Sequence, residues 1–481
     1  MSQNSSKYGI YNIPSTVPFS QALVSGILSG KILQFQEQNP LALNDTIILL
    51  PTRRACQTIS REFVKLNEQK GLILPRIFPI GDIDDEYQGL TDLILRGIGN
   101  FPQPVSEIKR QLLLTRLVTS WKISYEKSIS SNREWSMEYS SRLATELSKL
   151  LDAIQLEGLD FSKLKELAPD NFAGHWQNIL EFLEILTKSW PEILSEQGLI
   201  DPAYRLNLAL VTLSKYWKKN PTSNPVIIAG STGTMPAVTK LMQTILSLDQ
   251  GIVIIPGLDK DMDKELWDSI KPSHPQFALR TLLENLHTNR SIVKAWPHHF
   301  KSKENKERIR ILNTSLSYNL ESGKSLETFD QLKLGVNNLS IAECQSQQEE
   351  AGVIALKIRS DIDLAKINST NKNDRNLLPK VALVTSDRRL AHRVTTELLQ
   401  WNLSVDDSAG MPLGWTNTGA LFRLTAQVCK IHTTPVDLLA ILKHSLSSGN
   451  LRTDIFKETV KKIESIFFRG PEKYLYFSHL D

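Results

Sequence analysis

Short apolar runs followed by segments of helical periodicity are the main pattern in this chain. Residues 381–384 (VALV) are all apolar, and apolar positions then recur every three or four residues from Leu390 to Leu398. An unbroken apolar run is typical of a buried parallel strand, and the later spacing predicts a helix with one apolar face. Ser386 or Asp387 would cap that helix by accepting hydrogen bonds from its first amides. The pattern predicts a strand, a tight turn and a helix.

The same order occurs in residues 46–64 (TIILLPTRRACQTISREFV). In both segments two arginines stand where the helix should begin: Arg53 and Arg54 in one, Arg388 and Arg389 in the other. Open α/β sheets bind their ligands outside the carboxyl ends of parallel strands, where these turns would lie. We therefore expect two α/β lobes forming a cleft lined with cations, which suits a phosphate backbone.

Two further parallel strands are predicted in residues 225–259. An apolar run, the turn GSTG and a helical segment fill residues 225–246, and residues 251–259 (GIVIIPGLD) contain the next run. Ser231 and Thr232 in the turn would offer hydroxyl groups to a phosphate at a helix N-terminus. The turn contains no lysine, so it is only weakly specific for a phosphate. A tight strand-to-helix turn without a ligand is the alternative interpretation of the same residues.

Residues 105–216 have instead the spacing of long amphipathic helices. Ile108, Leu112 and Val118 fall on one side of the first of them, and we expect that side to face a core. The change of periodicity predicts a helical insertion.

These elements predict an α/β fold with two parallel-sheet lobes. The first lobe would be discontinuous, made of residues 1–104 and 217–310, with the helical insertion at 105–216 between its parts. A polar linker, residues 311–335, would lead to a second lobe, residues 336–481, which we expect to be incomplete at its C-terminus.

Composition narrows the classes of function only slightly. The chain has 481 residues and a net charge of +4, which permits nucleic-acid binding without requiring it. Its three cysteines, Cys56, Cys344 and Cys429, are far apart and lack the spacing of a disulfide framework or a metal site. No apolar run approaches the roughly 18 residues of a membrane span, and no signal peptide is evident. We expect a cytoplasmic protein without a metal or cofactor of its own.

A first strand is predicted at residues 8–13 and a first helix at residues 19–28, and the connection between them bears on nucleotide binding. A phosphate-binding loop needs glycines, whose backbone amides wrap the phosphates, and a lysine that supplies charge. Residues 12–19 (NIPSTVPF) contain Pro14 and Pro18 but neither glycine nor lysine. The sequence therefore predicts no Walker A motif.

A polar loop, DDSAG, follows the helix near Arg388. Its residues Asp406, Asp407 and Ser408 are a possible polar site, and the two aspartates are candidate metal ligands in an enzyme. The preferred interpretation of DDSAG is a polar loop that closes the second lobe.

As a set, several segments resemble the AddB subunits of the bacterial AddAB helicase-nucleases, in their alphaproteobacterial form. The similar segments follow the order of that family over nearly the whole chain: LLPTRRACQ (49–57), LPRIFPIGDIDDE (74–86), AGSTGTMPA (229–237), VIIPGLD (253–259), HPQFALRTLLENL (274–286), VALVTSDRRLAHRV (381–394), DDSAGMPLG (406–414) and LLAILKHSL (438–446).

The resemblance implies a superfamily 1 helicase-like scaffold with two RecA-like lobes, the first carrying the helical insertion. It also implies action on duplex DNA ends and single-stranded DNA in double-strand break repair and recombination, together with the motor subunit AddA, which would use ATP and Mg²⁺. In that family a C-terminal nuclease domain and an iron–sulfur cluster follow. No such sequence lies before Asp481, so nuclease activity is not expected here.

The preferred hypothesis is a non-catalytic, DNA-binding subunit of the helicase-nuclease complex. The candidate DNA contacts are Arg53, Arg54, Ser231, Thr232, Arg388, Arg389 and Arg393. Surface ion pairs, with Asp387 or Glu397 for the second set, are the alternative for the arginines. A stand-alone metal-dependent ATPase or nuclease, and a truncated remnant that acts only as a partner-binding scaffold, are the alternative functions.

Overall fold

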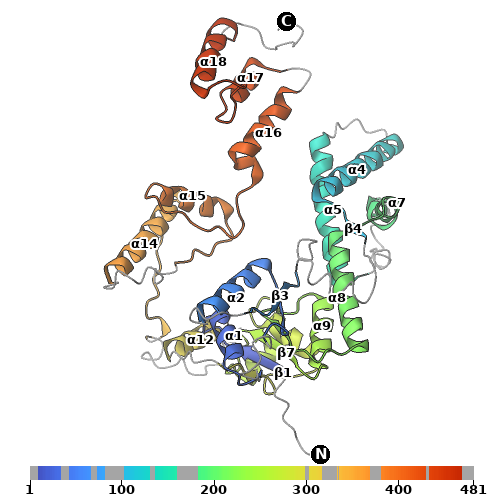
Figure 1. The fold of residues 1–481 in the computed structure, drawn as a ribbon, viewed down its shortest axis with the longest axis vertical. Coiled ribbons are helices and arrows are strands. Elements are labelled where there is room, and N and C mark those ends of the chain that lie inside the picture. The colour runs from blue at the N-terminus through green and yellow to red at the C-terminus, as the bar shows by residue number, and fades with distance from the viewer. Residues whose placement is uncertain are drawn as a thin grey trace, which may run out of the picture. The chain divides into compact units, whose positions relative to one another are not determined.

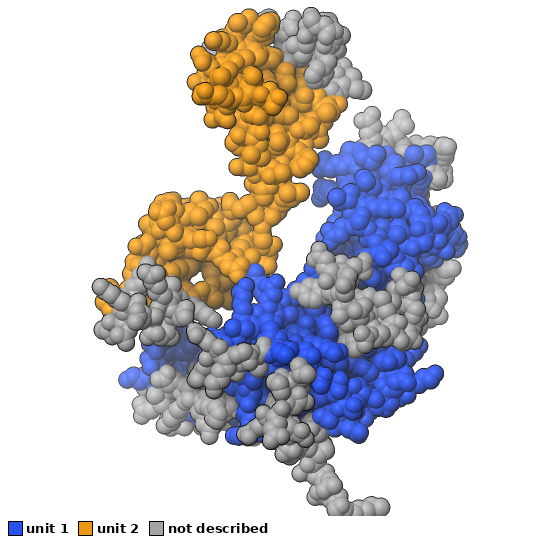
Figure 2. All heavy atoms as spheres, in the orientation of Figure 1, with its two compact units in different colours: residues 1–339 blue, residues 340–481 orange. Residues whose placement is uncertain are grey.

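The computed structural model describes residues 9–33, 43–66, 73–81, 102–129, 136–159, 182–297, 303–316, 333, 335–368, 381–429 and 433–468 (Figure 1). The chain divides into two compact units, residues 1–339 and 340–481 (Figure 2). The division lies close to residue 336, where the sequence predicts the second lobe to begin. Residues 311–316 of the predicted linker are helical, at the end of α12 (Lys303–Leu316). Most of the remaining linker lies outside the described residues.

A six-stranded sheet in the order β3-β2-β6-β7-β1-β8 forms the centre of the first unit, and every pair of neighbouring strands is parallel. Its central strands are apolar runs that are buried on both faces, as the sequence predicts for parallel strands. In chain order the strands are β1 (Gly9–Ile13), β2 (Ile47–Leu50), β3 (Arg76–Pro79), β6 (Val226–Ala229), β7 (Gly251–Pro256) and β8 (Lys294–Ala295).

Helices cover both faces of this sheet. Alternate side chains of the strands point to opposite faces, so the sheet has two separate cores. On one face Ile48, Ile227 and their equivalents pack against α1 (Phe19–Leu28) and α2 (Arg53–Leu66). The other face packs against α8 (Pro202–Lys219), α9 (Pro236–Leu246) and α11 (Phe277–Asn285), with α10 (Lys264–Ser269) beside them. This is a doubly wound α/β arrangement.

The connecting helices change from one face of the sheet to the other between the neighbouring strands β2 and β6. The helix that follows β2 covers one face, whereas the helix that follows β6 covers the other. Adjacent strands whose connections leave in opposite directions open a crevice at their carboxyl ends, and such crevices are the usual ligand sites of open α/β sheets.

The helices between β3 and β6 have a core of their own. This core lies among α4 (Glu107–Ile129), α5 (Met137–Glu157), η3 (Ile185–Ser189) and α7 (Trp190–Glu196), and the short strands β4 (Gln103–Pro104) and β5 (Leu199–Ile200) pair beside it. Helix α8, which falls mostly within the predicted insertion, packs instead on the sheet through Leu210, Leu213 and Trp217.

The expected apolar face of α4 is partly wrong. Leu114 and Val118 are buried, but Ile108 and Leu112 are 77% and 61% exposed. The helix therefore uses a face rotated from the predicted one, because its partners are α5 and η3.

A buried carboxylate joins these helices. Asp201, directly before α8, accepts hydrogen bonds from Nε1 of Trp190 (2.5 Å) and from Nε2 of Gln155 (3.3 Å). Nε of Arg110 lies 2.9 Å from its other oxygen, and both terminal nitrogens of Arg110 bond Asp152. Burial raises the pKa of Asp201 above its ordinary value, and the charge of Arg110 opposes the increase.

The described part of the second unit is helical. Ala351 and Ala355 of α14 (Gln347–Asn368) pack on Val394 and Leu398 of α15 (Arg388–Leu399). The remaining elements are the short turn η5 (Leu413–Trp415), α16 (Asn417–Val428), α17 (Pro435–Leu442) and α18 (Thr453–Phe467).

The prediction of a strand at residues 381–384 is wrong for the described structure. These residues belong to no strand among the described residues, and the Val384 side chain is 93% exposed. Ile341, before α14, likewise belongs to no described strand, and its side chain is 87% exposed. An apolar run favours an extended backbone, but a strand also needs a neighbour to accept its hydrogen bonds. All strands that the structure describes lie in the first unit, so a second parallel sheet is not formed by the described residues.

The cysteines differ in environment. Cys56 on α2 is buried, and burial raises the pKa of its thiol to about 11, which makes it unreactive. Cys429 is exposed. Of the described helices, none combines the length and the apolar character needed to cross a membrane.

Candidate functional site

The carboxyl ends of β2 and β6 bring the first group of predicted residues together. Gly230, directly after β6, has a positive φ of 76° and lies under Phe19 and Pro51. A Cβ at Gly230 would be 3.3 Å from the ring of Phe19 and 3.7 Å from Cδ of Pro51. The loops after β1, β2 and β6 therefore meet at one edge of the sheet. The carboxyl end of the β2–β6 pair, where the topology leads us to expect a crevice, lies beside this meeting point.

Arg53 and Arg54 form the first turn of α2 at this edge. Thr52 caps the helix, because its Oγ1 accepts a hydrogen bond from the amide of Ala55 (3.1 Å). Arg53 is half-buried and Arg54 is exposed. The first turn contains no acidic residue. Two cations at the positive end of a helix dipole weaken the helix, by up to about 1 kcal/mol each. Their position is unfavourable for stability but favourable for attracting an anion.

Ser231 and Thr232 lie across the β2–β6 pair from these arginines, both half-buried. Oγ of Ser231 accepts a hydrogen bond from the amide of Gly233 (3.2 Å), and Thr239 donates one to the carbonyl of Gly233 (2.8 Å). The amide of Gly230 bonds Ile254 of β7 (3.1 Å). The turn thus uses two of its own amides, as a tight strand-to-helix turn does. The Ser231 hydroxyl hydrogen remains available as a donor.

The neighbouring loop after β7 is held by Asn12 of β1. Its Nδ2 donates to the carbonyl of Leu258 (2.7 Å), and its Oδ1 accepts from the amide of Leu258 (3.0 Å). Gln276 holds the same loop from the other side, through the carbonyl of Gly257 and the amide of Asp259. The carboxyl edge of the sheet is consequently rigid before any ligand binds.

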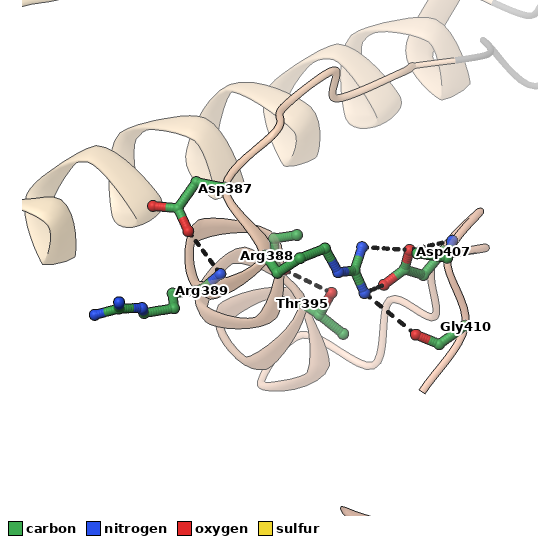
Figure 3. Close-up of polar contacts among 8 residues, drawn as sticks. Asp387, Arg388, Arg389, Thr395, Asp407 and Gly410 are labelled. Carbon is green, nitrogen blue, oxygen red and sulfur yellow. Dashed lines mark hydrogen bonds and ion pairs between the residues drawn. The ribbon is translucent and has the colours of Figure 1, made fainter. Parts of the chain in front are cut away.

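The second group of predicted residues lies at the start of α15 (Figure 3). Asp387 caps this helix, because its Oδ1 accepts a hydrogen bond from the amide of Arg389 (2.8 Å), as the sequence predicts. Arg388 forms a two-pronged ion pair with Asp407, with distances of 3.0 and 2.7 Å, and also donates to the carbonyl of Gly410 (3.2 Å). The hydrogen bonds that Arg388 donates to Asp407 raise the pKa of Arg388. The charge of Arg388 is therefore matched within the second unit.

The same contacts define the DDSAG loop. Oδ1 of Asp407 also accepts a hydrogen bond from the amide of Ala409 (2.9 Å), so both carboxylate oxygens have partners. Asp406 and Ser408 are exposed. Within the described residues, no cluster of three or more His, Cys, Asp or Glu side chains has the geometry of a metal site. Asp407 therefore anchors the DDSAG loop to the start of α15.

Arg389 and Arg393 differ from Arg388. In Figure 3 the side chain of Arg389 points away from Asp407. Arg393 lies one turn further along α15 and is half-buried. Neither guanidinium forms an ion pair with another described residue. They are the cations of this group whose charge is not already matched by a carboxylate.

Sequence reasoning missed several residues. Nothing in the sequence distinguishes Asn12 from an ordinary strand residue. Its role in holding the loop after β7 follows from the burial of its side chain and its two hydrogen bonds with Leu258. Trp415 and His392 were not singled out, yet their rings are in contact, 5.2 Å between centroids. No sequence signal marks such a pair, because its members are far apart in the chain.

The sequence matches no protein-family model and no curated protein. The class that the first unit defines is a doubly wound α/β protein with a parallel six-stranded sheet. The likeness to AddB subunits rests on the sequence segments quoted above.

Proposed function

We propose that this chain is a non-motor, DNA-binding subunit of a helicase-nuclease complex that processes double-strand DNA ends in recombinational repair. One observation carries the proposal: Arg53 and Arg54 stand at a helix N-terminus at the carboxyl end of the β2–β6 pair. This is the usual ligand position of open α/β sheets, and cations there favour an anionic ligand. The segments that resemble AddB support DNA as that anion.

The connection between β1 and α1 supports the non-motor role. It includes Pro14 and Pro18, which have no amide hydrogen, and Val17 donates its amide to the carbonyl of Pro14. This connection offers few amides to a phosphate. Under the proposal, ATP and Mg²⁺ are used by an AddA motor, and this chain supplies no catalytic residue. The same proposal includes a cytoplasmic location, two RecA-like lobes and a helical insertion in the first of them.

The DNA contact is tested by neutralising the arginine pair. Arg53→Gln/Arg54→Gln is expected to weaken binding to a labelled duplex end about tenfold at physiological salt, because two phosphate contacts are lost. The slope of log K against log[salt] should become shallower by roughly 2, since each contact releases about 0.9 counterion. Fluorescence anisotropy between 50 and 200 mM salt, roughly the range over which such contacts weaken, measures both quantities.

The matched control is Arg61→Gln/Lys65→Gln. It removes the same charge from exposed positions on the same helix, further from the sheet edge. This variant should bind within about twofold of the wild type, because counterion release requires local contact. Equal losses in both variants, or wild-type binding that does not change with salt, would contradict the proposal.

Exposed apolar side chains support a partner-binding role for the second unit. Ile341 and Val384 are almost fully exposed in extended segments, which is unusual for large β-branched residues. We expect the chain to capture the AddA motor subunit in a pull-down, and Ile341→Ser/Val384→Ser to lose this capture. Capture without any DNA affinity would favour the scaffold-only function instead.

A further inference from the structure

Trp415 is placed on α15 by the loop that Arg388 anchors. Arg388 holds Asp407 and Gly410 at the first turn of the helix. One turn later, His392 meets the ring of Trp415, with centroids 5.2 Å apart and planes tilted by 51°. The loop therefore follows the outward face of α15 for one turn and ends on an aromatic pair.

The position of Trp415 is fixed by its own backbone. Its amide donates to the carbonyl of Pro412 (2.9 Å) within η5. Thr416 caps α16 by accepting from the amide of Gly419 (3.0 Å), and its hydroxyl donates to the carbonyl of Leu413 (2.7 Å). A Cβ at Gly419 would lie 1.8 Å from that carbonyl, so the turn and α16 are in direct contact. The indole is presented on a rigid support.

Two other tryptophans show how this chain buries a structural indole. Trp190 and Trp296 are each 1% exposed, and their ring N–H groups donate to Asp201 and to the carbonyl of Ala22. Trp415 is 60% exposed, and its N–H bonds no other residue in the described ranges. Its ring is therefore not packed in a hydrophobic core.

The charge around Trp415 selects the class of ligand. In an α-helix, Arg389 and Arg393 are each one residue, or 100°, from the positions of Arg388 and His392. They thus lie on the outward side of α15, near His392 on the helix surface, and neither forms an ion pair with a described residue. A hydrophobic protein surface docked there would have to desolvate two unmatched cations, which is costly. An aromatic platform with adjacent cations suits single-stranded nucleic acid, whose bases stack while its phosphates meet the cations.

We propose that Trp415, supported by His392 on a helix that also carries Arg389 and Arg393, stacks on an unpaired base of single-stranded DNA. The inference deepens the proposed function and rests on it for the choice of DNA. It assigns to the second unit the capture of a strand that has already been separated.

The test compares two labelled oligonucleotides with the full chain: oligo(dT), and an abasic strand of the same length and charge. Wild-type protein is expected to bind oligo(dT) roughly tenfold more tightly, since one stacked base contributes that much. Trp415→Ala should abolish the difference between the two strands. Trp415→Phe should keep most of it, whereas Trp415→Leu, which is apolar but cannot stack, should not. Leu413→Ala removes an exposed apolar side chain two residues away and should change nothing.

Two outcomes overturn the inference. Equal binding of both strands by the wild type means that only phosphates are contacted. Equal behaviour of the leucine and phenylalanine variants means an apolar contact, which a parallel pull-down with the motor subunit would identify as a protein interface. The duplex-end experiment on Arg53 and Arg54 is independent, so loss of duplex binding with a preserved preference for oligo(dT) defeats the proposed function and leaves the stacking site. Thermal unfolding of every variant, unchanged from the wild type, excludes misfolding as the cause.

Discussion

Replacing Asp201 by alanine is expected to lower the free energy of unfolding by about 3 kcal/mol. The carboxylate is 2% exposed and has three partners, on α4, α5 and α7. Its loss leaves the buried N–H of Trp190 without an acceptor and opens a cavity among the helices. Urea denaturation followed by tryptophan fluorescence measures the change, because Trp190 lies at the site.

Asp152→Ala is the matched control. It removes the other carboxylate that bonds Arg110, but the Asp152 side chain is 37% exposed. We expect a loss of about 1 kcal/mol, since water replaces part of the contact. Equal losses in the two variants would show that Arg110, and not the buried indole, determines the cost.

The pH dependence of the Asp201→Ala effect has a definite sign. Burial raises the pKa of Asp201 above its ordinary value of 3.8. Just above pH 3.8 the folded protein therefore keeps a proton that the unfolded chain releases, and this contribution to stability falls as the pH rises through the folded pKa. The alanine variant lacks that slope. The difference in stability between the two proteins should be largest on the acidic side of the interval.

The sequence predicted the first unit well because its strands are short, wholly apolar and flanked by turns. Residues 47–50, 226–229 and 251–256 could hardly be anything but buried strands in a chain with helices between them. The start of α2 at Arg53 and the cap of α15 at Asp387 were likewise readable, because caps are local.

Where prediction failed, the deciding partner was distant in the chain. The run at 381–384 has the composition of a strand but no neighbouring strand in the described part of its unit. The packing face of α4 depends on α5 and η3, which local periodicity cannot identify. Arg388 looked equivalent to Arg389, and only the fold brings Asp407, nineteen residues away, to one of them. Local sequence defines elements, whereas long-range contacts define which side chains remain for function.

Asn12→Ala is expected to destabilise the protein by about 3 kcal/mol, because two buried backbone groups of Leu258 lose their side-chain partner. Both Asn12 and Leu258 are almost fully buried, at 5% and 2% exposure. Asn12→Asp should also destabilise, since a carboxylate oxygen would then face the Leu258 carbonyl. Gln276→Ala, on the half-buried side of the same loop, should cost only about 1 kcal/mol. Chemical denaturation gives these values, and hydrogen exchange at the Leu258 amide should accelerate in Asn12→Ala.

The same variant separates support of the sheet edge from contact with DNA. Asn12 lies on β1, which is three strands from β2 in the sheet order, and its amide group is turned to the β7 loop. Folded Asn12→Ala protein should therefore bind a duplex end within about twofold of the wild type, with an unchanged salt slope, because no phosphate contact is removed. A large loss of affinity in the folded variant would move the DNA contact from the carboxyl end of the β2–β6 pair towards β1 and β7. Such a result would require the loops at Ser15 and Gly257 to form part of the site; they are close enough that a Cβ at Gly257 would lie 3.5 Å from Cβ of Ser15.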